Sequence, residues 1–346
     1  MVRISDIAED LGVSRSLVSK VLSGKMGQST VRPELAERIR ARARQLGYVP
    51  NMSAKSLFTG RQHAIGVFIS RHGQPGSGLV EALIDGVSAE LAKTQQRMIL
   101  QFFHDEPDFE PCLAAAHRNL LDGVVVAGAP YFDLKPHLKT ILGRGVPVAT
   151  MFDTPVSPEI PNAGIDQTEV GYAATRHLVE RGCRAPALVF ISRPEVNLRY
   201  AGYCRALKEA GIPLRSERLC RLRTYEGAKL PDLVQALIAS GEPFDGIVAE
   251  SDRQSAIILR ALLGAGVRVP RDVKLIGVDD APVCEFSPVH LSSVSGQDRR
   301  RAALTVRLLQ EVIEGKPPRH VLTPPTVSAR ESTAASDVGS VAPSAF

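Results

Sequence analysis

The N-terminal part of the chain carries side chains that could bind phosphates and nucleobases. Residues 1–61 hold 11 Lys and Arg residues against five acids, a net charge of +6, whereas the rest of the chain sums to −1. A compact basic segment suits a nucleic-acid backbone, because each neutralised phosphate releases condensed counterions. A solvated helix face would carry the same charge. The apolar pattern beneath the charge therefore has to distinguish the two.

Three short helices are expected to position these side chains. Ser5 is expected to cap a helix that ends at Gly12, and Ser14 to cap a second helix with one apolar face. Pro33 opens a third helix. The outer face of the second helix is polar and basic, with Arg15, Ser16, Ser19 and Lys20. Two short helices joined by a glycine turn predict a helix-turn-helix.

An ordered series of motifs runs through residues 3–60. It comprises Ile7-Ala8, Leu11-Gly12-Val13-Ser14, Val18-Ser19-Lys20-Val21-Leu22, Leu46-Gly47-Tyr48-Val49-Pro50-Asn51, and Ala54 with Leu57. The series resembles the headpiece and hinge of the LacI/GalR family of transcriptional regulators. The resemblance implies that a set of side chains binds DNA by contacting base edges or the backbone: Arg3, Ser14, Arg15, Ser16, Ser19 and Lys20.

Residue chemistry supports one of these roles independently. Arg15 can bind a guanine through two hydrogen bonds, which discriminates against other bases by roughly 1–3 kcal/mol. Two departures limit the transfer of the others. Leu17 stands where the family more often has a small residue such as threonine, and Lys20 replaces the usual arginine. The connection over residues 23–31 is also longer than the family pattern, so no contact is assigned there.

Residues 51–61 are expected to form a separate hinge. Asn51 can cap one or two helical turns, but an isolated helix of that length is unstable in water. By resemblance, two such helices pair on DNA and Leu57 wedges into the minor groove with Ala54 alongside, kinking the duplex. A plain linker is the alternative. Folding of the hinge on DNA would couple DNA binding to the spacing of the two bodies.

From residue 64 onward, short apolar runs alternate with amphipathic helices, a pattern typical of parallel sheets. The first series ends with a strand over Pro147–Phe152, and an irregular stretch over Thr154–Gly164 follows. A second series then runs from Val170 to Val278, and a last helix, Arg299–Ile313, with a closing segment to Arg330, is expected to return across both lobes. The predicted fold is thus a small all-α helix-turn-helix headpiece plus an α/β body of two doubly wound lobes. By resemblance, the body is similar to periplasmic binding proteins.

Open parallel sheets bind ligands beyond the carboxyl ends of their strands, so the cleft between two facing lobes is the expected site. Polar residues at predicted strand ends are Ser70, Asp153, Ser251 and Asp279. The resemblance adds Arg199 as an effector-binding arginine and implies that Asp279 accepts hydrogen bonds from sugar hydroxyls. A carboxylate and a guanidinium can each hold two vicinal hydroxyls. The expected effector-binding residues are Ser70, Asp153, Arg199, Ser251 and Asp279.

The chain has no Trp, so a ring contact with a sugar would have to come from Phe102, Phe152 or Tyr200. Ser251 stands where asparagine occurs in the family. Arg71 and Arg193 lie near strand ends and favour an anionic sugar acid or a phosphate.

Catalysis, cofactors and metals are not expected. The loop over residues 73–78 is rich in glycine but lacks the GK[ST] of a P-loop and the order of GxGxxG. It is expected to line the ligand cleft. No GxSxG or HExxH occurs, and the histidines stand apart. The five cysteines are widely spaced without a CxxC, which favours buried, reduced thiols in a cytoplasmic protein.

The composition is that of a folded protein in water, with 44% hydrophobic and 23% charged residues, no membrane span and no signal peptide. We expect residues 1–50 to be the headpiece, 51–61 the hinge, 62–333 the effector-binding and dimerisation domain, and 334–346 a tail. The tail lacks leucine heptads, which favours a homodimer over a tetramer.

These residues predict a repressor of a carbohydrate-type catabolic operon that binds a pseudo-palindromic operator and is released by a sugar, sugar acid or sugar phosphate. An activator, or a repressor that needs a co-repressor, stays open. A soluble sugar-binding transport or sensor protein would share the body, but it would need a signal peptide and no basic headpiece.

Overall fold

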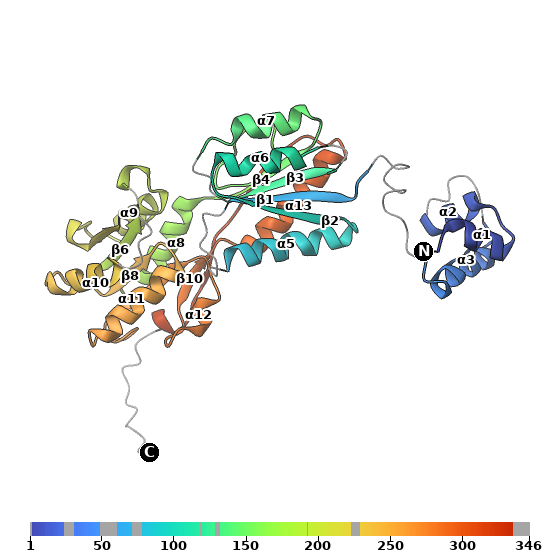
Figure 1. Cartoon of the computed structure of the whole chain (residues 1–346). Coiled ribbons are helices and arrows are strands. Elements are labelled where there is room, and N and C mark those ends of the chain that lie inside the picture. Colours follow the sequence, from blue (N-terminus) through green and yellow to red (C-terminus); the bar gives the residue numbers. More distant parts are fainter. Residues whose placement is uncertain are drawn as a thin grey trace, which may run out of the picture. The chain divides into compact units, whose positions relative to one another are not determined.

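The computed structural model describes residues 2–23, 31–48, 61–70, 78–117, 120–128, 132–191, 193–222 and 229–334. It contains two compact units, Met1–Gln62 and His63–Phe346 (Figure 1). The predicted hinge residues Asn51, Ala54 and Leu57 lie outside the described residues.

The described part of the first unit is three helices packed around a small apolar core. They are α1 (Ile4–Leu11), α2 (Arg15–Ser23) and α3 (Pro33–Gln45). Ile7, Val18 and Ile39 are fully buried between them. The carboxylate of Asp10 on α1 pairs with the guanidinium of Arg42 on α3 through two contacts of 2.5 and 2.9 Å, which ties the first helix to the third.

The caps of these helices follow the sequence in two of three cases. Gly12 ends α1 with φ of +65°, a conformation that glycine adopts without strain. The Ser14 Oγ accepts a hydrogen bond from the Leu17 N–H (3.2 Å) at the start of α2. The prediction that Ser5 caps α1 is wrong. The helix already begins at Ile4, because the Asp6 carboxylate accepts a hydrogen bond from the Arg3 N–H (2.9 Å).

The first lobe of the second unit is a six-stranded sheet, entirely parallel, in the order β11-β5-β4-β3-β1-β2. Helices α5 and α13 pack against each other and against one face of this sheet. Helices α6 and α7 pack against its other face. The elements are β1 (Ala64–Ser70), α5 (Leu79–Lys93), β2 (Arg97–Phe103), α6 (Glu106–Ala115), β3 (Gly123–Ala127), α7 (Lys135–Gly143), β4 (Val148–Met151), β5 (Asn162–Ile165), α13 (Asp298–Ile313) and β11 (His320–Thr323).

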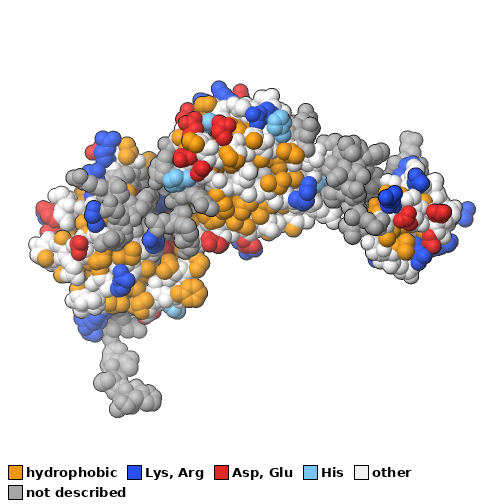
Figure 2. Space-filling view, in the orientation of Figure 1, with side chains coloured by type: hydrophobic (Ala, Val, Ile, Leu, Met, Phe, Trp, Pro, Cys, Tyr) orange, Lys and Arg blue, Asp and Glu red, His pale blue; other side chains and the backbone are white. Residues whose placement is uncertain are grey.

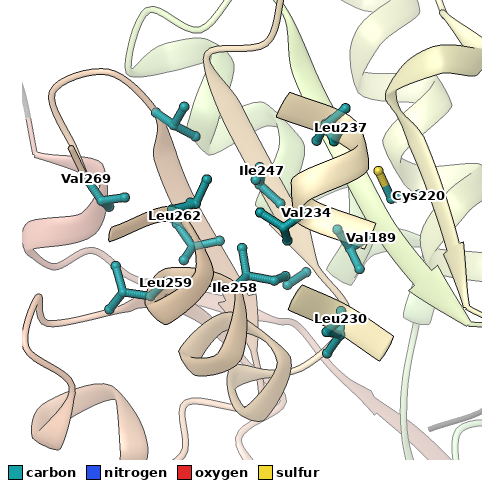
Figure 3. Close-up of a cluster of buried hydrophobic side chains, with 14 of the residues drawn as sticks. Val189, Cys220, Leu230, Val234, Leu237, Ile247, Ile258, Leu259, Leu262 and Val269 are labelled. Atoms are coloured by element: carbon teal, nitrogen blue, oxygen red, sulfur yellow. The ribbon is translucent and has the colours of Figure 1, made fainter. Parts of the chain in front are cut away.

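The second lobe repeats this architecture with the order β12-β10-β9-β8-β6-β7, in which only β12 runs antiparallel to its neighbour. Its elements are α8 (Gln167–Glu180), β6 (Pro186–Ile191), α9 (Leu198–Glu209), β7 (Leu219–Leu222), α10 (Leu230–Ala239), β8 (Gly246–Ala249), α11 (Asp252–Gly264), β9 (Lys274–Val278), α12 (Val283–Phe286), β10 (Ser292–Ser295) and β12 (Thr326–Ser328). Figure 3 shows one of its cores, where Val234 of α10 and Ile258 of α11 pack against Ile247 of β8.

The described chain crosses between the lobes three times. It passes from β5 to α8, from β10 to α13, and from β11 to β12. The predicted return of the closing segment across both lobes is therefore confirmed, since β11 joins the first sheet and β12 the second. The Gln297 side-chain amide donates to the Pro324 carbonyl (2.6 Å), which links the second crossing to the third.

Several boundaries differ from the predicted ones. The stretch over 154–164 is not irregular throughout, because β5 begins at Asn162. The buried Asn162 side chain accepts from the Phe152 N–H and donates to the Phe152 carbonyl, both at 3.0 Å, which pairs it with the neighbouring segment as a backbone would. Helix α6 spans 106–115, because Asp105 caps it by accepting from the Asp108 N–H (3.0 Å).

The cysteines are free thiols, as expected, and four of them are buried, but Cys204 is only half-buried. In the described part of the chain, no helix is both long enough and apolar enough to span a bilayer.

Candidate functional site

The outer face of α2 presents the polar residues that the sequence singles out. Arg15, Ser16, Ser19 and Lys20 are exposed, while Val18 and Val21 on the opposite face are buried in the headpiece core. Lys and Arg side chains are spread over the face of the first unit seen in Figure 2. This amphipathic division leaves the basic face of α2 accessible to a ligand, as a recognition helix requires.

The remaining predicted headpiece residues lie at helix starts. Arg3 and Ser14 are exposed, at the starts of α1 and α2. Leu17 is only half-exposed, since it packs against the core between the helices. Its departure from the family pattern therefore adds apolar contact within the headpiece.

All five predicted effector-binding residues line a single cleft of about 800 Å³ between the two lobes. Ser70 ends β1, and Asp153 follows β4, both in the first lobe. Ser251 follows β8, Asp279 follows β9, and Arg199 lies in the first turn of α9, all in the second lobe. The carboxyl ends of strands from both sheets thus face one opening, the usual ligand position in such folds.

The hydroxyl groups of Ser70 and Ser251 differ in their hydrogen bonding. The Ser70 side chain is 3% exposed, and its Oγ has no hydrogen-bond partner in the described part of the chain. The Ser251 Oγ caps α11 by accepting from the Gln254 N–H (3.3 Å). Because of this cap, α11 begins at Asp252.

Arg199 is held in place by contacts within its own lobe. Its Nε donates to the Gln167 side-chain oxygen (2.7 Å), and one Nη donates to the Glu250 carbonyl. The Glu250 carboxylate accepts hydrogen bonds from the Ile191 N–H (2.6 Å) and from the Asn197 amide. Burial raises the pKa of Glu250, although the nearby Arg199 opposes the rise. This arrangement holds the guanidinium at the cleft wall.

Asp279 lies in a strained turn. Its φ is +113° and that of Asp280 is +57°, both unusual for residues other than glycine. Surrounding groups hold the turn: the Ser293 Oγ accepts from the Asp280 N–H (3.0 Å), the Arg330 guanidinium lies 2.8 Å from the Asp280 carboxylate, and the buried Asp252 carboxylate accepts from the Ala281 N–H (2.8 Å).

The Asp279 carboxylate faces the cleft and accepts no hydrogen bond from any described residue. Burial raises its pKa well above the usual value. Arg199 opposes that rise, while Asp252 and Asp298 add to it.

Sequence reasoning missed several groups in the cleft. Glu250 directly precedes Ser251 at a strand end, so it carried a usable signal. Asp298 and Arg301 lie in the first turn of α13, where the chain crosses between lobes, and no strand pattern marks that position. The Arg301 guanidinium donates to the Asp298 carboxylate (3.2 Å) and lies 3.8 Å from the carboxylate of Asp153.

Of the three rings named as candidates for a sugar contact, one is in the described cleft lining. Phe152 lines the cleft, and Phe132 joins it without having been predicted. Tyr200 instead stacks on Phe190, with the ring centroids 5.6 Å apart, and neither Tyr200 nor Phe102 belongs to the described cleft lining.

The two arginines predicted near strand ends are not among the described residues of the cleft lining. Arg193 is exposed and lies outside the described lining, and Arg71 lies outside the described residues. Of the glycine-rich loop, only Gly78 is described. It lines a neighbouring groove along α5, which shares Asp279 and Asp298 with the cleft.

Comparisons with known proteins agree with this architecture. The family "Bacterial regulatory proteins, lacI family" matches residues 3–51, and the family "Periplasmic binding protein-like domain" matches residues 175–333. The HTH-type transcriptional regulator GntR of Pseudomonas aeruginosa is 27% identical over 318 residues, 90% of each chain. The HTH-type transcriptional regulator CelR of Thermobifida fusca is 28% identical over 318 residues, 90% of this chain and 91% of that one.

A solved structure shows the same fold over almost the whole chain. The Lac repressor dimer bound to operator and the anti-inducer ONPF superposes with a TM-score of 0.72 at 20% identity, covering 96% of this chain and 99% of that one. The helix-turn-helix, the two lobes with their shared cleft, and the relatives lead to one conclusion. Residues 3–51 match the lacI family of bacterial regulatory proteins, and the chain is a ligand-responsive, DNA-binding transcriptional regulator.

Proposed function

We propose that this protein represses a carbohydrate-type catabolic operon and that a small polyhydroxy effector releases it from its operator. Residues 1–50 would bind DNA through α2, residues 51–61 would form the hinge, and residues 62–333 would bind the effector. The observation that carries the proposal is that five strand-end and helix-start residues chosen from the sequence line one cleft between two lobes. A ligand that contacts both lobes changes their angle, since it binds the closed arrangement more tightly than the open one.

The DNA-binding residues are proposed on the geometry of α2. Arg15 and Ser16 lie at its start and are exposed, so they would contact base edges, with Ser19 and Lys20 beside them. Arg3 and Ser14 would contact the backbone. One headpiece makes few contacts, whereas two on a pseudo-palindrome add theirs, so a homodimer in the cytoplasm is the proposed working form.

The effector-binding residues are proposed on the cleft. Asp279 and Arg199 would hold neighbouring hydroxyls from the second lobe, because a carboxylate and a guanidinium can each bind two. Ser70 and Asp153 would contact the effector from the first lobe. Ser251 has its Oγ occupied as a helix cap, so it would act mainly by placing α11. No step of this function requires catalysis.

A DNA titration tests the proposal. The full-length protein is titrated onto a fluorescent duplex from the region upstream of its own gene and onto a random duplex of equal length. Tighter binding to the first duplex at matched salt is expected, and release on addition of a carbohydrate. Asp279→Asn should keep the DNA affinity and lose the release. Equal binding to both duplexes contradicts the proposal, and tightening by the ligand would make the protein a co-repressor-dependent regulator.

A further inference from the structure

The described walls of the cleft carry more negative than positive side chains. Three guanidiniums face five carboxylates: Arg199, Arg253 and Arg301 against Asp133, Asp153, Glu250, Asp279 and Asp298. A cation that enters this cleft favours the ionised form of these carboxyl groups, whereas an anion opposes it, and low-dielectric walls strengthen both effects.

The two arginines with partners are already engaged by acceptors of the protein itself. Arg199 donates to the Gln167 side chain and to the Glu250 carbonyl. Arg301 is 6% exposed, and its two terminal nitrogens contact the Asp298 carboxylate and, more weakly, the Ala163 carbonyl. Arg253 is exposed at the cleft wall. A phosphate or carboxylate would therefore have to displace existing contacts to bind the terminal nitrogens of Arg301, whereas Arg199 keeps the donors of its second terminal nitrogen.

Two of the carboxylates, in contrast, have oxygen atoms that could accept further hydrogen bonds. Asp279 accepts no hydrogen bond from a described residue, and Asp298 has one guanidinium contact at 3.2 Å. Burial raises the pKa values of both groups, and their mutual repulsion adds to the rise in Asp279. A hydroxyl group could donate to Asp279 but would not offset the cost of burying the ionised carboxylate. An ammonium group donates hydrogen bonds and also neutralises the charge.

An independent observation shows that the cleft is built for a polar ligand. The Ser70 Oγ, from the opposite lobe, lines the same cleft, is buried and has no partner in the described part of the chain. A buried hydroxyl without a partner is costly unless a ligand supplies one. Val196 and Leu198 are apolar cleft residues that stay 63% and 48% exposed, so the cleft is open to such a ligand.

We propose that the effector is a polyhydroxy compound bearing an ammonium group, which binds between Asp279 and Asp298 while a hydroxyl of the same compound meets Ser70. This inference rests on the proposed function, because it names the charge of the effector for the same cleft. It replaces the sugar acid or sugar phosphate favoured by Arg71 and Arg193 in the sequence.

A panel of matched compounds tests the ligand class. D-glucose, D-glucosamine, D-gluconate and D-glucose 6-phosphate, with the corresponding galacto and manno series, are titrated calorimetrically into the full-length protein at pH 7. The ammonium member should bind about tenfold more tightly than its hydroxyl counterpart, and N-acetylation should abolish the gain. Asp279→Asn should weaken the binding of both compounds and remove the difference between them. Tighter binding of a carboxylate or phosphate member, or equal binding of amine and hydroxyl, overturns the proposal.

A charged side chain introduced at the cleft wall tests the electrostatic preference of the cleft without any ligand. Val196 lines the cleft, so Val196→Lys and Val196→Glu are compared by melting temperature at low salt, in the wild-type chain and with Asp279→Asn. The lysine variant should melt several degrees higher than the glutamate variant, and Asp279→Asn should shrink the difference. An unchanged difference contradicts the proposal, whether or not a panel compound binds.

The same pair of substitutions at Leu214, which is 47% exposed and outside the described cleft lining, is the control. Asp279→Asn should leave the difference between its lysine and glutamate variants unchanged. Failure of the proposed function would appear as equal binding to operator and random DNA. The melting comparison does not depend on that result, so the two failures are distinguishable.

Discussion

The carboxylate of Asp252, fully buried at the start of α11, accepts a hydrogen bond from the backbone N–H of Ala281 at 2.8 Å. Ala281 directly follows the strained pair Asp279 and Asp280, so one buried acid supports the turn that faces the cleft. Ser293 and Arg330 hold the same turn from two other segments. The position of Asp279 thus depends on groups that do not themselves face the cleft.

Asp252 predicts a pH dependence of stability. Burial raises its pKa to about 6; hydrogen bonds from Ala281, Ser293 and Cys284 oppose the rise and Asp280 adds to it. The pKa of Asp252 is higher in the folded chain than in the unfolded one, so its protonation stabilises the folded chain. This contribution to the free energy of unfolding is fully present below about pH 4 and is lost as the pH rises through 6. Asp252→Asn should flatten the pH dependence of the free energy of unfolding between pH 4 and 6, measured by urea unfolding.

Asp252→Ala is the contrasting variant. It removes the acceptor for the Ala281 N–H, which should cost about 1–3 kcal/mol at pH 7. Asparagine keeps a carbonyl acceptor and loses the buried charge, so it should be at least as stable as the wild type at that pH. Equal losses in both variants would show that the charge itself stabilises the turn.

The sequence predicted those cleft residues that lie at the ends of strands with a clear apolar run. The apolar runs that precede Ser70, Asp153 and Asp279 form strands in the structure, and parallel strands bring their carboxyl ends to one edge. The strands that the sequence did not predict lack such runs. Two are Ser292–Ser295, where buried Ser292 and Ser293 hydrogen-bond through their side chains, and Asn162–Ile165.

The cleft residues that were not predicted are placed by the connections between the lobes rather than by a local sequence pattern. Asp298 and Arg301 line it because α13 begins at a crossing between the lobes, and Phe132 lines it from the segment that precedes α7. Such placements depend on how two lobes are joined, and this information is spread over three distant crossings. Local hydrophobic periodicity describes each element alone.

Two substitutions on α2 should separate base recognition from backbone binding. Arg15→Ala should weaken binding to the operator by about 1–3 kcal/mol and change binding to random DNA little, because bidentate base contacts carry the discrimination. If Lys20 contacts phosphate, Lys20→Ala should weaken both duplexes similarly and reduce the salt dependence. Affinities are measured by fluorescence anisotropy at several salt concentrations. Equal losses on both duplexes for Arg15→Ala would remove Arg15 from base recognition.

The contact between α8 and α9 should control the position of Arg199. A Cβ on Gly171 would lie 2.1 Å from the Arg199 carbonyl oxygen, so Gly171→Ala must push the first turn of α9 away. We expect a loss of about 1–3 kcal/mol in the free energy of unfolding, together with weaker effector binding in calorimetry. Gly264→Ala, at a helical glycine with open space around it, is the control. It should be neutral or slightly stabilising.

Arg301 should be important for stability because its positive charge lies next to the carboxylates of Asp298 and Asp153. Its guanidinium is 6% exposed, donates to Asp298 and lies 3.8 Å from the carboxylate of Asp153, while its Nε has no partner in the described part of the chain. Arg301→Met leaves the Asp298 charge uncompensated, which should cost about 3–5 kcal/mol in urea unfolding at pH 7.

Adding Asp298→Asn to Arg301→Met should recover part of this loss, because the double variant no longer buries an unpaired charge. Since the chain contains no Trp, unfolding is followed by circular dichroism. A double variant as unstable as Arg301→Met alone would show that Arg301 stabilises the lobe through packing of its side chain rather than through its charge.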